Sequence, residues 1–129
     1  MNNYKEIITN TIKELGIPAH IKGYHYVRRA IELMVEDISL MDLITKALYP
    51  KVAKEFDTTP SRTERAIRHA IDTGWNRGNI DFTSKLFGYT INANKGKPTN
   101  SEFIATVADY ILMLNGSQTY KGGAQANDY

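Results

Sequence analysis

Three arginines recur at three-residue steps in one segment of the chain, a spacing that would place them on a single face of a helix. They are Arg62, Arg65 and Arg68, and His69 follows the last of them. Side chains three or four residues apart are neighbours on a helix surface, so this set would point in one direction. The guanidinium group is planar and holds its N–H donors in a fixed fork, which matches phosphate oxygens and the O6 and N7 atoms of guanine. The chemistry that these residues could perform is therefore recognition of phosphate or of a base edge.

Few acidic residues stand where they would neutralise these arginines. Glu64 lies at the edge of the face and immediately precedes Arg65, and adjacent residues on a helix do not face each other. The other polar residues expected on the face are Ser61, Asp72 and Asn76. Because a charged helix face is more often solvated than functional, the interpretation depends on the elements that would carry it.

The segment from Val52 to Arg77 is typical of a helix-turn-helix, which would present this face. Thr59 can cap a helix that starts at Pro60, because proline in the first helical turn loses no amide hydrogen bond. Behind the arginines, small and apolar residues recur at helical steps, at Thr63, Ala66, Ile67, Ala70, Ile71 and Gly74. Upstream, a short helix would turn Val52, Ala53 and Phe56 inward. An apolar back and an arginine-rich front suit a recognition helix in the DNA major groove, and they predict a DNA-binding protein.

Composition and charge are consistent with this prediction. A chain of 129 residues with 42% hydrophobic content suits one domain with a real core. The net charge is only +2, but residues 41–100 hold ten Lys/Arg and six Asp/Glu, which leaves +4 there and −2 in the remainder. The absence of cysteine excludes disulfides and fits the cytoplasm. No signal peptide is recognisable, and no run is long enough to span a membrane.

Helical periodicity continues along the whole chain and predicts an all-α domain. Helices are expected at about residues 4–15, from near Gly23 or Tyr24 to about residue 38, and at about residues 40–46, 51–56, 60–75, 80–86 and 101–114. Ser39 would cap the third of these, and Thr99 or Asn100 the last. Residues 89–91 could be extended, although one such run cannot form a sheet. From Gly116 the composition turns to Gly, Ser, Gln and Asn, so we expect a domain over residues 1–115 and a disordered tail over 116–129.

The residues needed for catalysis or metal binding do not form a constellation. His20, His25 and His69 lack the i, i+4 spacing of a zinc site, and no cysteine is available to complete one. Residues 96–99 resemble the end of a phosphate-binding loop only superficially, because Pro98 occupies the position of the required Ser or Thr. We therefore predict that the chain is not an enzyme, and we expect neither a cofactor nor a metal ion.

Several longer motifs resemble those of a known family. They are IKGYHYVRRAI, RTERAIRHAI over residues 62–71, LFGYT, and KPTNSEF over residues 97–103. They are similar to the C-terminal effector domain of stage zero sporulation protein A, the response regulator of endospore formation in Firmicutes, over about residues 6–114. The resemblance implies a six-helix domain with a helix-turn-helix that binds tandem promoter boxes of the TGTCGAA type. It also implies activation or repression of transcription through contact with RNA polymerase sigma subunits.

By position, the resemblance implies a role for each polar residue of the site. The residues that would reach base edges are Arg62, Glu64 and Arg65, and the carboxylate can accept a hydrogen bond from cytosine N4. Those that would lie near the DNA backbone are Ser61, Arg68 and His69. Lys97 would hold a phosphate together with the backbone amides at a helix start, those of Thr99, Asn100 and Ser101. The helix dipole favours an anion at this end of a helix.

The resemblance also implies partners other than DNA. The surface over residues 80–88 would face polymerase, and the last helix would pack one domain against another on adjacent boxes. The chain departs from the family at Pro60, where alanine is expected, and at Thr73-Gly74, where a bulkier pair is expected. The glycine should weaken its helix by roughly 1 kcal/mol. No receiver domain is expected, since nothing alternates strands and helices, so the chain is either an excised effector domain or a natural chain without its switch. We predict that it binds DNA without a phosphoryl signal.

Two other functions stay open from the residues alone. A sequence-tolerant nucleic-acid-binding module would show a steep salt dependence and little preference for the box. A protein-interaction domain would instead use the arginine face to meet an acidic partner.

Overall fold

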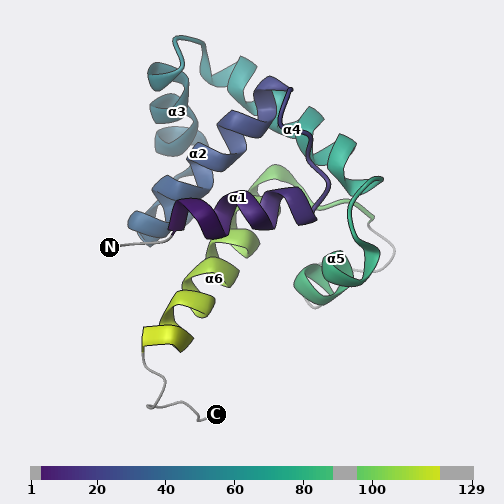
Figure 1. Cartoon of the computed structure of the whole chain (residues 1–129). Helices are drawn as coiled ribbons and strands as arrows, with labels where there is room; N and C mark the ends of the chain where they lie inside the picture. Colours follow the sequence, from purple (N-terminus) through teal and green to yellow (C-terminus); the bar gives the residue numbers. More distant parts are fainter. Residues whose placement is uncertain (1–3, 89–95, 120–129) are drawn as a thin grey trace.

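The computed structural model describes residues 4–88 and 96–119 (Figure 1). Every regular element among these residues is helical, which confirms the predicted all-α fold. The α-helices are α1 (Tyr4–Glu14), α2 (Lys22–Glu36), α3 (Tyr49–Glu55), α4 (Pro60–Trp75), α5 (Ile80–Phe87) and α6 (Asn100–Thr119). A 3-10 helix, η1 (Ile38–Asp42), and a π-helix, η2 (Ile44–Leu48), connect α2 to α3. In the described part of the chain, no helix is apolar over a stretch long enough to cross a bilayer.

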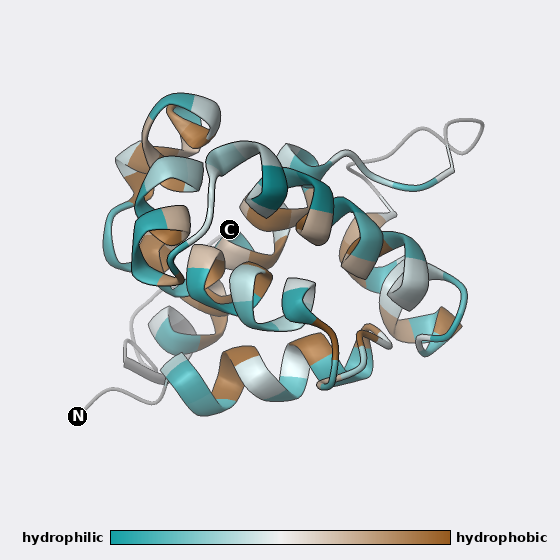
Figure 2. Cartoon of the chain, turned by 90° about the horizontal axis from the view of Figure 1, so that it is seen from above, coloured by the Kyte–Doolittle hydropathy of each residue, from teal (hydrophilic) through white to brown (hydrophobic). Residues whose placement is uncertain are grey.

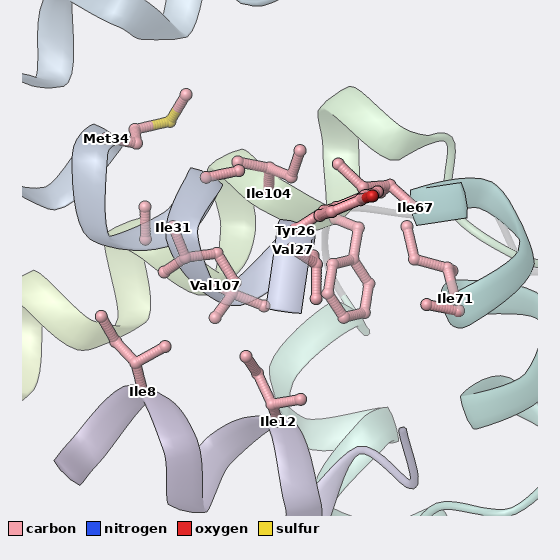
Figure 3. Packing of buried hydrophobic residues seen from close by; sticks show 14 of the residues in the cluster. Ile8, Ile12, Tyr26, Val27, Ile31, Met34, Ile67, Ile71, Ile104 and Val107 are labelled. Atoms are coloured by element: carbon pink, nitrogen blue, oxygen red, sulfur yellow. The ribbon is translucent and has the colours of Figure 1, made fainter. Parts of the chain in front are cut away.

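The core forms around α2, which packs against α1, α4 and α6 (Figure 1). Ile8 and Ile12 of α1 point toward Val27 of α2 and Val107 of α6, and all four side chains are buried (Figure 3). Hydrophobic and polar stretches alternate along the ribbons of the helices (Figure 2). Each fully buried side chain of this size contributes about 1.5–3 kcal/mol. Because α4 also packs against α2, this core holds the two helices in fixed positions relative to each other.

The predicted helix-turn-helix is present as α3 and α4, which pack against each other. The side-chain oxygen of Thr59 accepts a hydrogen bond from the Arg62 N–H at 3.2 Å, and Pro60 occupies the first turn of α4. The chain turns between the two helices at Asp57, whose φ of 55° lies in a region that Asp tolerates. The bounds predicted for the second helix, residues 60–75, are confirmed. Its start could be predicted because the start signals are local.

The prediction that Phe56 points inward is wrong. Phe56 is 40% exposed rather than inward, and its ring rests against Tyr26 at 5.0 Å between centroids. Because α3 ends at Glu55, Phe56 leaves the helical stripe that Val52 and Ala53 follow into the core. The periodicity of a short helix does not specify where that helix ends.

The helix predicted over residues 40–46 with a Ser39 cap is also wrong. Asp37, not Ser39, caps this region, and its carboxylate accepts hydrogen bonds from the Ser39 N–H at 3.1 Å and hydroxyl at 2.6 Å. These bonds start η1, and Leu43 then leaves helical geometry with φ −130° and ψ 33°. The chain resumes in a π-turn closed by the Leu48 N–H on the Leu43 carbonyl at 3.0 Å. Local side-chain hydrogen bonds here compete with the α-helical ladder.

The last helix differs from its prediction at the far end. Its start is a reciprocal capping box, in which Thr99 Oγ1 accepts from the Glu102 N–H at 3.1 Å and Glu102 Oε1 accepts from the Thr99 N–H at 2.9 Å. The predicted Thr99 cap is confirmed. The helix continues to Thr119, past residue 114 and into the segment predicted as a tail. Residues 120–129 of that tail and the extended run at 89–91 lie outside the described residues.

The glycine at position 74 has a packing role that the sequence did not reveal. A Cβ atom at Gly74 would come within 2.8 Å of the Leu15 carbonyl oxygen and 2.7 Å of Ile17 Cγ1. The connection between α1 and α2 therefore passes directly over the C-terminal end of α4. The propensity loss of roughly 1 kcal/mol is offset by this close approach.

Arg29 joins α2 to α3 through an ion pair. Its Nε lies 2.7 Å from Glu55 Oε1, its Nη2 3.2 Å from Glu55 Oε2, and its Nη1 3.0 Å from Glu32. The hydrogen bond from Arg29 lowers the pKa of Glu55, and burial opposes it only in part. The forked contact holds the first helix of the helix-turn-helix against the central helix.

The substitution Glu55→Gln is expected to lower the free energy of unfolding at pH 7 by up to about 1 kcal/mol, as for a solvent-screened pair. Since the folded-state pKa is depressed, this stability is fully present above the unfolded value of 4.5 and is lost as pH falls through the lower folded value. Urea unfolding of both proteins at pH 7 and pH 3 measures the effect. A difference that persists undiminished at pH 3 would contradict the ion-pair origin.

Candidate nucleic-acid interface

The outward face of α4 carries the residues predicted to recognise DNA. Ser61, Arg62, Glu64, Arg65 and His69 are exposed. Within the described residues, the side chains of Arg62 and Arg65 have neither a hydrogen bond nor an ion pair. The opposite face is buried at Thr63, Ile67, Ala70, Ile71 and Gly74, as the periodicity predicts. The N-terminal half of α4 therefore presents two free guanidinium forks and a carboxylate on a rigid, well-packed helix.

The start of α6 lies beside this face. Asn100 donates from Nδ2 to the Glu64 carbonyl at 3.0 Å, and Arg68 donates from Nη1 to the Pro98 carbonyl at 2.9 Å. These two bonds cross between segments that are far apart in sequence. They bring the residues predicted around position 100 into one surface with those of α4.

A groove of about 330 Å³ opens where the two segments meet. Its lining comes from η2, the start of α3, α4 and the start of α6, at Thr45, Tyr49, Glu64, Arg65, Arg68, Thr99, Asn100 and Ser101. The sequence offered no sign that Thr45 and Tyr49 belong here, because only the packing of α3 against η2 and α4 brings them close. Burial raises the pKa of Tyr49, so its hydroxyl stays protonated and can donate a hydrogen bond.

The helix start is partly occupied by the protein's own groups. The Thr99 N–H donates to the Glu102 carboxylate. Asn100 is only 8% exposed, and its side chain is hydrogen-bonded to α4. The backbone N–H groups of Asn100 and Ser101 have no partner among the described residues. These two amides, rather than the Thr99 amide or the Asn100 side chain, can receive an anion there.

The expectation that acidic partners are scarce on this face is wrong for Arg68. Its Nε donates to Asp72 Oδ1 at 3.1 Å, and its Nη2 lies 2.9 Å from the same oxygen. Lys97 Nζ lies 3.5 Å from that oxygen as well. The pair Arg68–Asp72 has the i, i+4 spacing of helix neighbours, whereas the approach of Lys97 depends on the loop before α6. Among the described residues, Arg62 and Arg65 have no carboxylate partner, whereas Arg68 and Lys97 share that of Asp72.

A model of the family described as "Sporulation initiation factor Spo0A C terminal" matches residues 8–111. The chain belongs to this family. It is therefore a DNA-binding effector domain of the kind that regulates sporulation transcription in a response regulator. The match covers all of α2 to α5 and most of α1 and α6, so the helix-turn-helix and the groove beside it both lie within the family domain.

A second surface of this Spo0A C-terminal domain lies around α5, in the stretch predicted to face polymerase. Phe87 is core, stacked on Phe103 at 5.5 Å between ring centroids, whereas Ile80 is 79% exposed. Phe82 is half-buried against Tyr110 at 5.8 Å. A mainly apolar groove of about 450 Å³ runs between α5, α6 and η1, lined among others by Lys85, Leu86 and Met113.

Proposed function

We propose that this domain recognises TGTCGAA-type boxes by laying α4 in the major groove. Arg62 and Arg65 would pair with guanine edges and Glu64 with a cytosine amino group. The observation that carries the proposal is that both arginines are exposed on the N-terminal half of a rigid helix and have no partner among the residues that the structure describes. In a helix-turn-helix, that half of the second helix meets the bases.

The DNA backbone would be held on both sides of this contact. Ser61 and His69 are exposed on α4, and Lys97 stands on the loop before α6. In the groove between α4 and α6, a phosphate would meet Arg68 and the amides of Asn100 and Ser101, which have no partner within the described ranges. Such contacts fix the register of the protein on the duplex, and the base contacts supply specificity.

Other parts of the proposal rest on the family. The surface over residues 80–88 would contact an RNA polymerase sigma subunit, with Ile80 its most exposed apolar residue. Domains on tandem boxes would associate through α6. The domain would work in the cytoplasm. It would bind DNA without a phosphoryl signal, because the polar face of α4 is already exposed in this chain.

The test is binding to a labelled duplex containing TGTCGAA and to a scrambled duplex, each at two salt concentrations. We expect a preference for the box of about a thousandfold, roughly 4 kcal/mol. Affinity for the scrambled duplex should fall steeply with salt, since counterion release drives it. Equal affinity for both duplexes would indicate a sequence-tolerant module, and no binding to either would leave a protein-interaction domain as the better account.

A further inference from the structure

We propose that Asp72 is a built-in counterion that lowers the affinity of this domain for the DNA backbone without taking part in base recognition. The inference rests on the proposed function of the α4 face. It concerns a residue whose charge has the wrong sign for a DNA-binding surface. Asp72 lies on the same face of α4 as the arginines and is 42% exposed there.

The geometry divides the two cations that Asp72 touches into a fixed one and a displaceable one. Arg68 has a second anchor, its Nη1 bond to the Pro98 carbonyl, so it stays in place whatever happens at the carboxylate. Lys97 is 44% exposed and approaches Asp72 at 3.5 Å, beyond ordinary hydrogen-bond length. A phosphate could therefore capture Lys97 but would have to do so beside a carboxylate.

That carboxylate opposes phosphate in two ways. It already neutralises part of the charge of Arg68 and Lys97, so fewer counterions are released when DNA binds. It also repels an incoming phosphate directly, since charges a few ångströms apart are not fully screened by salt. Both effects depend on phosphate and are the same for every DNA sequence.

The base-reading end of α4 lies beyond this influence. Arg65 precedes Asp72 by seven positions, which is about 10 Å along a helix axis, and Arg62 is further still. The screening length at physiological salt is about 8 Å. Asp72 should therefore change absolute affinity and leave the preference among sequences almost unchanged.

The substitution Asp72→Asn tests this because it removes the charge and keeps an oxygen that can accept from Arg68 Nε. We expect both the TGTCGAA duplex and the scrambled duplex to bind about fivefold more tightly, from the loss of one nearby like charge. The dependence of log affinity on log salt should steepen by about 0.9 for each cation set free. The ratio of the two affinities should change less than twofold.

Two further variants separate this effect from a general change in charge. Glu36→Gln also removes one negative charge. Glu36 is the last residue of α2, whereas α2 meets α4 near its first turn, at Gly23. This variant should therefore leave the affinity for both duplexes unchanged. In a Lys97→Met background, the increase in DNA affinity caused by Asp72→Asn should fall by at least half, because the displaceable cation is absent. Thermal unfolding of each variant checks that the fold is intact.

The outcomes are distinguishable. If the wild-type domain prefers the box but Asp72→Asn binds equally or more weakly, Asp72 only positions Arg68, and this inference is wrong while the proposed function stands. If Asp72→Asn changes the box-to-scrambled ratio severalfold, the residue takes part in base recognition and the inference is equally overturned. Failure of the wild-type domain to bind either duplex would overturn both proposals.

Discussion

Replacing Arg65 by alanine is expected to weaken binding to a TGTCGAA duplex by about 1–3 kcal/mol and to relax the preference at one base pair. Arg65 is exposed on α4, and its side chain has no partner within the described residues, so its removal costs the fold little. The loss therefore reports on the interface alone. Titrations against duplexes carrying each base at each position of the box measure it. An equal loss on all sequences would mark Arg65 as a phosphate contact instead.

The matched control is Arg65→Lys, which keeps the charge but removes the planar fork. It should retain the affinity of the wild-type domain for a scrambled duplex and lose most of the preference for the box. If lysine preserves that preference, the contact is a point charge and the proposed bidentate pairing is incorrect.

The substitution Gly23→Ala is expected to destabilise the domain by about 1–3 kcal/mol, as overpacking does. A Cβ atom at position 23 would overlap the Ala66 carbonyl oxygen and come within 2.7 Å of Ala70 Cβ. The Ala66 carbonyl is backbone of α4 and cannot move without displacing α4 from α2. Urea unfolding measures the loss of stability. DNA titration without urea, where the variant is still folded, should show weaker binding.

Gly116→Ala serves as the control for the change in helix propensity. Nothing lies within 4 Å of a Cβ atom at Gly116, which is also helical. Alanine there should leave stability unchanged or raise it by up to about 1 kcal/mol. If both alanine variants lose a similar amount of stability, the effect at Gly23 does not come from the close contact between α2 and α4.

Local signals made α4 predictable from the amino-acid order. The Thr59 cap, Pro60 and an apolar residue at every third or fourth position act within a few residues of one another, so the bounds of α4 and its outward arginines follow from sequence. Predictions were wrong where local signals compete or end. Asp37 diverts the chain into η1, and Phe56 lies just past the end of α3.

The composition of the groove beside α4 was settled by packing alone. Residues near 45, 65 and 100 share one surface because α2 holds α4 and α6 at fixed positions, and no periodicity records that contact. The same holds for the role of Gly23 and for the approach of Lys97 to Asp72. Helix formation depends on neighbours along the chain, and therefore the amino-acid order specified which face of α4 would be basic. The pairing of charges across that face depends on distances between helices, and those exist only once the core has formed.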